Sequence, residues 1–194
     1  MTAPLSCIIG LSGKRLKKSE SLFLRDANPW GVILFARNVK DPDQLRKLTG
    51  DIRDAMGRNT LIFIDQEGGR VQRMREPHWR AFPSGENYAS LYRRDRVDGL
   101  RACYLGHRLI ADDLRAVGIT SDCAPVLDLP QPGADPIISD RALGNCVEDI
   151  VEMAHAAMSG LMSGGVAPVI KHIPGHGRAS VDSQQTHGHG PGYV

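Results

Sequence analysis

The sequence predicts an α/β fold with a parallel sheet, because short apolar runs typical of strands alternate with longer stretches of helical periodicity. Some of these runs are apolar at every position, as expected for strands that are covered on both faces. The expected strands lie at residues 6–11, 31–36, 61–64, about 119–128 and 167–170. Repeated strand–helix units of this kind form a parallel sheet wrapped by helices.

Three stretches between these strands have the spacing of amphipathic helices. The first is expected from Pro42 to Gly57, because Asp41 can cap its first turn, proline is tolerated there and glycine ends it. The second has an apolar stripe over residues 100–117 and stops at Gly118. The third is expected to bury Val151, Ala154, Met158 and Leu161 before two consecutive glycines.

Composition excludes several classes of protein. The 194 residues carry a net charge of +2, with 41% hydrophobic and 24% charged residues, which is ordinary for a globular domain. This near-neutral balance offers no electrostatic argument for binding nucleic acid or an anionic membrane. No apolar run approaches the ~20 residues of a membrane helix, and the first residues lack the pattern of a signal peptide, so a cytoplasmic location is expected. The four cysteines form no C-x-x-C pair, and we expect neither a metal nor a cofactor.

Two architectures fit the alternating pattern at this length, which is that of one domain. One is an open doubly wound sheet, but no G-x-G-x-x-G follows the first strand, which weakens a dinucleotide-binding version. The other is a (β/α)8 TIM barrel, whose polar residues at strand ends form the active-site face. Eight strands typically need about 250 residues. The prediction is therefore an incomplete barrel with about the first five βα units.

The stretch Asp65-Gln66-Glu67-Gly68-Gly69-Arg70-Val71-Gln72-Arg73 directly follows a predicted strand. Its paired glycines permit a tight turn, which can bring Arg73 back over the strand end beside Asp65. A carboxylate next to an arginine suits the binding of adjacent sugar hydroxyls or of a polar substituent. A plain surface ion pair at a strand–turn–helix junction is the alternative.

A second polar stretch, Lys171-His172-Ile173-Pro174-Gly175-His176-Gly177, follows the last predicted strand. A lysine at the end of a buried strand is costly without a partner, which favours a functional role. Arg141 is a third candidate, although a lone loop arginine is usually a solvated charge. His107 and His155 fit helix-face positions better than ligand positions.

Together these segments resemble the family 3 glycoside hydrolases, specifically the bacterial cytoplasmic β-N-acetylglucosaminidases. The resemblance rests on GVILFARN, DQEGGRVQR, APVLDL and KHIPGHG followed by Val181-Asp182-Ser183, over roughly residues 5–183. It implies a (β/α)8 barrel and a retaining hydrolase that removes terminal N-acetylglucosamine from muropeptides during peptidoglycan recycling. The resemblance carries a sugar-binding set over to these positions: Asp65, Arg73, Arg141, Lys171 and His172.

The resemblance breaks at the catalytic groups. The subfamily has an Asp-Ser-His acid/base motif, whereas this sequence has Asp182-Ser183-Gln184. Glutamine has no titratable proton near neutral pH, so Asp182 would be the partner of an absent acid/base histidine. The family's nucleophile is an aspartate on a later strand. We therefore expect a C-terminally truncated and inactive chain, with a partial barrel at 1–183 and a non-homologous, disordered tail at 184–194.

Three hypotheses about the function stay open. The first is a β-N-acetylhexosaminidase by lineage, and the second is a non-catalytic protein that still binds N-acetylglucosamine. The third, weaker reading is a metal-dependent hydrolase that uses His187 and His189 with Asp182. An open set of strands should also leave residues 33–35 and 61–64 poorly covered and the chain prone to aggregate. The oligomeric state is left open.

Overall fold

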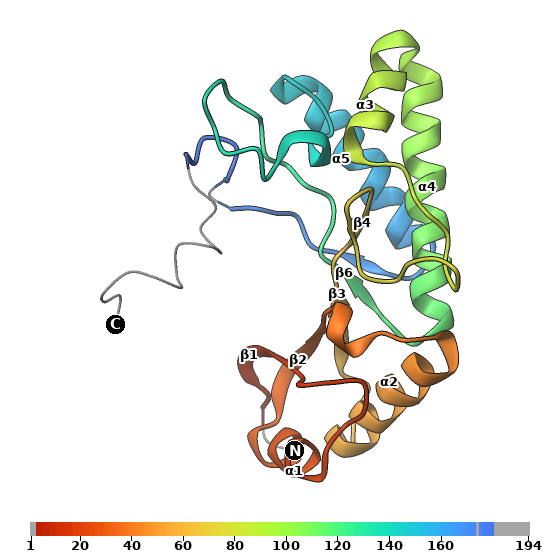
Figure 1. Cartoon of the computed structure of the whole chain (residues 1–194), viewed down its shortest axis with the longest axis vertical. Helices are drawn as coiled ribbons and strands as arrows, with labels where there is room; N and C mark the ends of the chain where they lie inside the picture. The colour runs from red at the N-terminus through yellow and green to blue at the C-terminus, as the bar shows by residue number, and fades with distance from the viewer. Residues whose placement is uncertain (1–2, 174, 181–194) are drawn as a thin grey trace.

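The computed structural model describes residues 3–173 and 175–180, and its centre is a five-stranded parallel sheet (Figure 1). Neighbouring strands in the sheet follow one another along the chain in the order β1-β2-β3-β6-β7. The strand bounds are β1 Leu5–Gly10, β2 Pro29–Leu34, β3 Leu61–Ile64, β6 Ser121–Asp122 and β7 Ala167–Pro168. The predicted parallel α/β sheet is confirmed.

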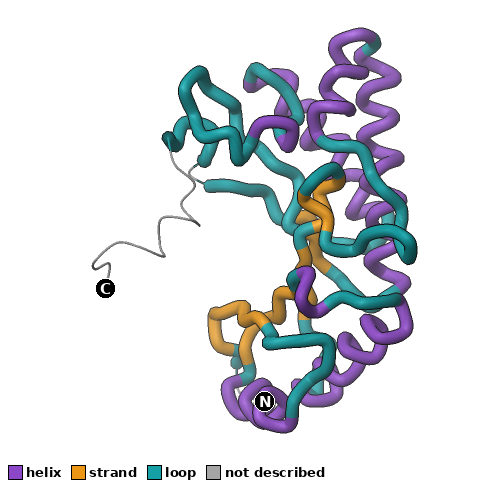
Figure 2. Tube along the Cα trace, viewed as in Figure 1, coloured by secondary structure: helices purple, strands orange, loops and turns teal. Residues whose placement is uncertain are grey.

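Helices connect the strands, and a short antiparallel hairpin follows β3 (Figure 2). The helices are α1 Lys18–Ala27, α2 Pro42–Met56, α3 Gly85–Arg94, α4 Arg96–Ala116 and α5 Val147–Ser163. The hairpin pairs β4 Gln66–Gly68 with β5 Val71–Gln72, and the 3-10 turns are η1 Ala36–Asn38 and η2 Ser139–Arg141. No helix in the described part of the chain is long and apolar enough to cross a membrane.

Helix α2 has the boundaries that its sequence predicts. The side chain of Asp41 accepts a hydrogen bond from the backbone N–H of Gln44 at 2.8 Å, and Pro42 occupies the first turn. Gly57 ends the helix in the left-handed conformation, with φ of 61°. Helix α1, which the sequence analysis did not predict, buries only Leu24 and therefore has no long apolar stripe.

The predicted buried face of α5 is partly wrong. Val151 is 48% exposed and Met158 is half-buried, whereas the buried residues include Ile150, Met153 and Ala157. The cause is close packing against α4, because a Cβ added to Gly160 would lie 2.3 Å from the carbonyl oxygen of Tyr104. The small residues of α5 therefore turn towards α4, which rotates the helix relative to the face expected from periodicity.

Strands β6 and β7 are shorter than predicted. Beyond Asp122 the two extended segments are joined by scattered backbone hydrogen bonds, with an isolated bridge between Val126 and Lys171, and not by a regular ladder. Pro125 and Pro168 lie in these segments and have no N–H to donate to a ladder, which shortens regular pairing.

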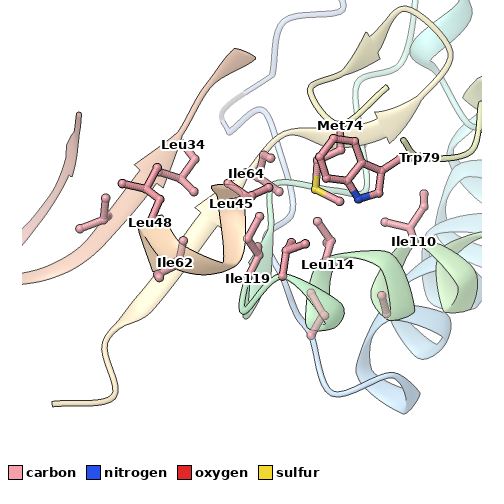
Figure 3. Packing of buried hydrophobic residues seen from close by; sticks show 14 of the residues in the cluster. Leu34, Leu45, Leu48, Ile62, Ile64, Met74, Trp79, Ile110, Leu114 and Ile119 are labelled. Atoms are coloured by element: carbon pink, nitrogen blue, oxygen red, sulfur yellow. The ribbon is translucent and has the colours of Figure 1, made fainter. Parts of the chain in front are cut away.

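The core lies between the sheet and its helices (Figure 3). Ile62 and Ile64 of β3 are fully buried there, and Phe63 on the opposite face is 4% exposed beside Trp30, with ring centroids 5.7 Å apart. The expectation that residues 61–64 are poorly covered is therefore wrong. Helices α2 and α4 cover one face of β3, and Figure 3 labels the residues of this packing: Leu34, Leu45, Leu48, Ile62, Ile64, Met74, Trp79, Ile110, Leu114 and Ile119.

Within the described residues, β1 and β7 form the two outer edges of the sheet. Exposed apolar side chains gather near both edges. Leu5, Ile8 and Trp30 lie at the β1 side, and Val169, Ile170 and Ile173 follow β7.

Candidate functional site

The carboxyl ends of parallel strands lie at one edge of a sheet, and here that edge collects the polar residues. Asp65 follows β3 directly, and Lys171 and His172 follow β7. Asp128 lies in the segment after β6, which runs beside the segment after β7 through a hydrogen bond from Leu127 N to Lys171 O of 2.6 Å. The fold thus brings residues from three strands to one place.

The hairpin after β3 returns Arg73 to Asp65, as the sequence predicts. Gly68 has a φ of 94°, and a Cβ at this position would lie 2.2 Å from the carbonyl oxygen of Pro83, so the turn requires glycine. The side-chain oxygen of Gln66 accepts hydrogen bonds from the backbone N–H groups of Arg73 and Met74, at 2.9 and 3.0 Å. Arg73 Nη2 then donates to Asp65 Oδ2 at 3.0 Å.

Lys171 joins the hairpin to the end of the sheet. Its Nζ lies 2.9 Å from Asp65 Oδ1 and also forms an ion pair with Glu67 Oε1. Glu67 in turn accepts two hydrogen bonds from Arg141, at 2.9 Å from Nε and 2.8 Å from Nη2. This two-pronged contact is the strongest geometry for an arginine–carboxylate pair.

The network continues to the segment after β6. Arg141 Nη2 lies 3.5 Å from His172 Nε2, and His172 Nδ1 lies 2.5 Å from Asp128 Oδ2. The other oxygen of Asp128 accepts the backbone N–H of His176. A continuous chain of polar contacts, which we call the ion-pair network, therefore runs through Arg73, Asp65, Lys171, Glu67, Arg141, His172 and Asp128.

Exposure divides the ion-pair network into two layers. The front layer reaches solvent, with exposed side-chain fractions of 28% for Arg73, 17% for Asp65, 12% for Lys171 and 35% for His172. The back layer is nearly covered, at 7% for Glu67, 9% for Arg141 and 0% for Asp128. The front layer can exchange hydrogen bonds with a polar ligand, whereas the back layer holds it in place.

Neighbouring groups favour the charged forms of Asp65, Asp128 and Lys171 near neutral pH. Burial alone would raise the pKa of Asp65, but Lys171 and Arg73 outweigh it and hold the pKa below its ordinary value. Burial would also raise the pKa of Asp128, and the contacts from His172 and the backbone of His176 lower it overall. Both carboxylates are therefore hydrogen-bond acceptors. Burial would lower the pKa of Lys171, but Glu67 and Asp65 raise it, so the amine stays protonated.

Asp122 is a buried carboxyl group beneath the site that the sequence analysis did not predict. Its Oδ1 accepts the backbone N–H of Gln66 at 3.0 Å, and Oδ2 has no hydrogen-bond partner in the described structure. Burial raises the pKa of this carboxyl well above its ordinary value, which favours the protonated form.

The structure brings together the five residues that the sequence analysis assigned to sugar binding: Asp65, Arg73, Arg141, Lys171 and His172. Their role in binding stays a prediction. Arg141 belongs to the back layer, so its geometry suits support more than direct contact. Asp182, His187 and His189 lie outside the described residues, as does the proposed tail at 184–194.

Glu67 and Asp128 are network residues that the sequence analysis missed. Both lie inside segments that it singled out, Glu67 in DQEGGRVQR and Asp128 in APVLDL, and their position there was the available signal.

Among the described residues, no group of three histidine, cysteine or acidic side chains is arranged to hold a metal ion.

A parallel α/β sheet with a polar site at its carboxyl edge is typical of both TIM-barrel-like and doubly wound α/β proteins, whose ligands bind at that edge. The comparisons with known proteins decide for the TIM-barrel-like class. A model of the glycosyl hydrolase family 3 N-terminal domain matches residues 6–191. The chain belongs to this family. The match includes residues 184–191, and the domain boundary at 183 stays a prediction.

Curated and solved relatives agree with this assignment. The chain is 40% identical over 176 residues to a beta-hexosaminidase from Alkalilimnicola ehrlichii, covering 91% of this chain and 50% of the relative. It superposes on native NagZ from Neisseria gonorrhoeae with a TM-score of 0.85 and 32% identity, covering 93% of this chain and 53% of that one. A second structure of that NagZ, in complex with N-trifluoroacetyl-D-glucosamine, gives a TM-score of 0.84 at 30% identity and covers 93% and 55%. The chain spans about half the length of these relatives.

Proposed function

We propose that this chain provides the N-acetylglucosamine-binding part of a family 3 β-N-acetylhexosaminidase. The ion-pair network is the observation that carries the proposal. Its front layer presents ionised acceptors at Asp65 and fixed donors at Arg73 and Lys171, which is the combination that binds neighbouring sugar hydroxyls. The N-trifluoroacetyl-D-glucosamine in the NagZ complex is a sugar of the proposed class and supports this choice.

The proposed substrate class is β-linked N-acetylglucosamine at the end of a muropeptide, released during peptidoglycan recycling in the cytoplasm. The family resemblance supports this class, and a site with balanced charges suits a neutral sugar. The four free cysteines agree with a reducing compartment.

We further propose that these 194 residues bind the sugar without hydrolysing it. Hydrolysis with retention needs a protonated group beside the leaving oxygen and a second carboxylate as nucleophile. Of the described network carboxylates, Asp65 and Glu67 are paired with cations and Asp128 with His172. Position 184, where the subfamily has its acid/base histidine, holds glutamine. The pairing of these carboxylates therefore favours sugar binding without hydrolysis, which is the second candidate function beside hydrolysis by the family's mechanism.

The test is titration of the folded chain with N-acetylglucosamine by calorimetry, followed by the same titration of Asp65→Asn. Losing a charged hydrogen-bond partner costs about 1.5–3 kcal/mol, so the variant should bind on the order of 10- to 100-fold more weakly. Asp140→Asn is the matched control, because Asp140 pairs with Arg70 on the surface at 42% exposure and lies outside the ion-pair network. Absence of binding by the wild-type chain, with circular dichroism showing it folded, would refute the proposal.

A second assay separates binding from catalysis. The wild-type chain is incubated with a chromogenic aryl β-N-acetylglucosaminide, and no release of the aryl group above the buffer rate is expected. Turnover that disappears in Asp65→Asn would show that the chain hydrolyses its sugar, and the binding-only proposal would be wrong.

A further inference from the structure

Asp128 is the most deeply covered charged group of the ion-pair network, with a side-chain exposure of 0%. It lies in the segment after β6, which is held against the segment after β7 by the bridge between Val126 and Lys171. A buried carboxylate is costly unless both of its oxygens have partners. The identity of those partners therefore indicates what Asp128 does.

Both oxygens of Asp128 contact the segment that follows β7. Oδ2 lies 2.5 Å from His172 Nδ1, and Oδ1 accepts the backbone N–H of His176. An ionised carboxylate only accepts hydrogen bonds, so Nδ1 of His172 has to carry the proton in this contact. The opposite ring nitrogen, Nε2, then lacks a proton in the neutral ring and lies 3.5 Å from Arg141 Nη2, on a side chain that is 35% exposed.

We propose that Asp128 is a positioning residue of the sugar site, which holds His172 in the Nδ1-protonated form with one oxygen and anchors the following segment at the His176 backbone with the other. Nε2 of His172 is thereby presented as an acceptor for a sugar hydroxyl. The statement about sugar rests on the proposed function, whereas the two contacts of Asp128 can be tested without sugar.

Other hydrogen bonds between the two segments make this role separable from folding. Gln131 N donates to Gly177 O at 3.0 Å, and Asp135 N donates to Ala179 O at 2.7 Å. These backbone bonds do not involve the side chain of Asp128. Removing its carboxylate should therefore release the ring of His172 and the amide of His176 while the segments stay joined further along.

The variants are Asp128→Ala, which removes both acceptors, and Asp128→Asn, which keeps one. Asp135→Asn is the matched control, because Asp135 lies in the same segment and its side chain accepts only the N–H of Ile137, at 2.8 Å, among the bonds described. Each protein is labelled with 15N-histidine, and the ring resonances of His172 are assigned by comparison with His172→Gln. Hydrogen exchange of the His176 amide and the Kd for N-acetylglucosamine complete the set.

The wild-type chain should show the Nδ1-protonated form of His172. Asp128→Ala should lose that signature, exchange the His176 amide at least about tenfold faster and bind the sugar about tenfold more weakly. Asp128→Asn has a single acceptor oxygen and a donor NH2, so it should lose either the Nδ1-protonated form of His172 or the protection of the His176 amide. Asp135→Asn should match the wild type in all three measurements.

Three results would overturn the proposal. The first is an Nε2-protonated His172 in the wild type, and the second is an unchanged ring signature in Asp128→Ala, which would leave Asp128 a structural role only. The third is normal sugar binding by Asp128→Ala despite the lost contacts. If the wild-type chain binds no sugar, the proposed function fails, and the ring and amide measurements still decide whether Asp128 holds His172 and His176.

Discussion

Replacing Glu67 with glutamine removes one negative charge from the centre of the ion-pair network. Glu67 accepts two hydrogen bonds from Arg141 and forms an ion pair with Lys171, and the three side chains are 7%, 9% and 12% exposed. Glutamine has nearly the same shape but cannot balance either cation. The variant therefore tests the electrostatic part of the network with little change in packing.

The expected loss in free energy of unfolding depends on the partners that Lys171 and Arg141 keep when Glu67 is replaced. Breaking a buried ion pair by removing one partner costs about 3–5 kcal/mol. Lys171 keeps Asp65 at 2.9 Å, and Arg141 keeps the carbonyl oxygen of Ile137 at 3.1 Å, so the loss should lie near the lower end, at about 3 kcal/mol. For a chain of this size the Tm should fall by roughly 6–12 °C.

The measurement is urea unfolding followed by circular dichroism at neutral pH, with Glu86→Gln as the control. Glu86 pairs with Arg93 at the surface, where the side chains are 39% and 38% exposed, and such a pair contributes about 0–1 kcal/mol. The reasoning is refuted if the two variants lose the same free energy of unfolding within about 0.5 kcal/mol, which is the size of an ordinary surface substitution.

Two further predictions concern the same region. The pKa of Asp122 is raised above its ordinary value of 3.8 in the folded chain. When the pH exceeds 3.8, the unfolded chain therefore releases a proton that the folded chain keeps. The free energy of unfolding then falls as the pH rises, by at most about 1.4 kcal/mol per pH unit. Asp122→Asn removes this loss, so its free energy of unfolding should rise relative to the wild type as the pH increases above about 4. A pH-independent difference in urea unfolding would contradict this. Gly68→Ala should cost more than twice as much free energy of unfolding as Gly57→Ala, because a Cβ at Gly68 meets Pro83 O at 2.2 Å while Gly57, also at positive φ, has nothing within 4 Å. If both variants lose the same free energy of unfolding in urea, the left-handed backbone conformation alone determines the loss, and the contact with Pro83 does not contribute.

Local signals made part of the fold and site predictable. Helix α2 begins and ends where Asp41 and Gly57 indicate, since both act within one turn of their own position. The Asp65–Arg73 pair was predictable for the same reason, because one hairpin joins residues eight positions apart.

Long-range packing decided the rest. Two overlapping sets of apolar residues in α5 have helical spacing, and the close contact of Gly160 with α4 decides which of them is buried. Glu67 and Asp128 have their partners 74 and 44 positions along the chain, at Arg141 and His172, so the local pattern marked their segments but not these two residues. The position of Lys171 at a strand end marked it as a candidate, and the resemblance to a family supplied the sugar-binding role of Lys171 and His172.

The order of the sheet has a consequence for how the chain gains its binding site. In the five-stranded sheet, β2, β3, β6 and β7 each pair with a strand that lies earlier in the chain, so this sheet can grow from the N-terminus without waiting for later segments. The ion-pair network cannot grow in this way, because Asp65 and Glu67 find Lys171 only when β7 has joined the sheet. The proposed sugar affinity would therefore develop last, and it would report during synthesis or refolding that the fifth strand has docked.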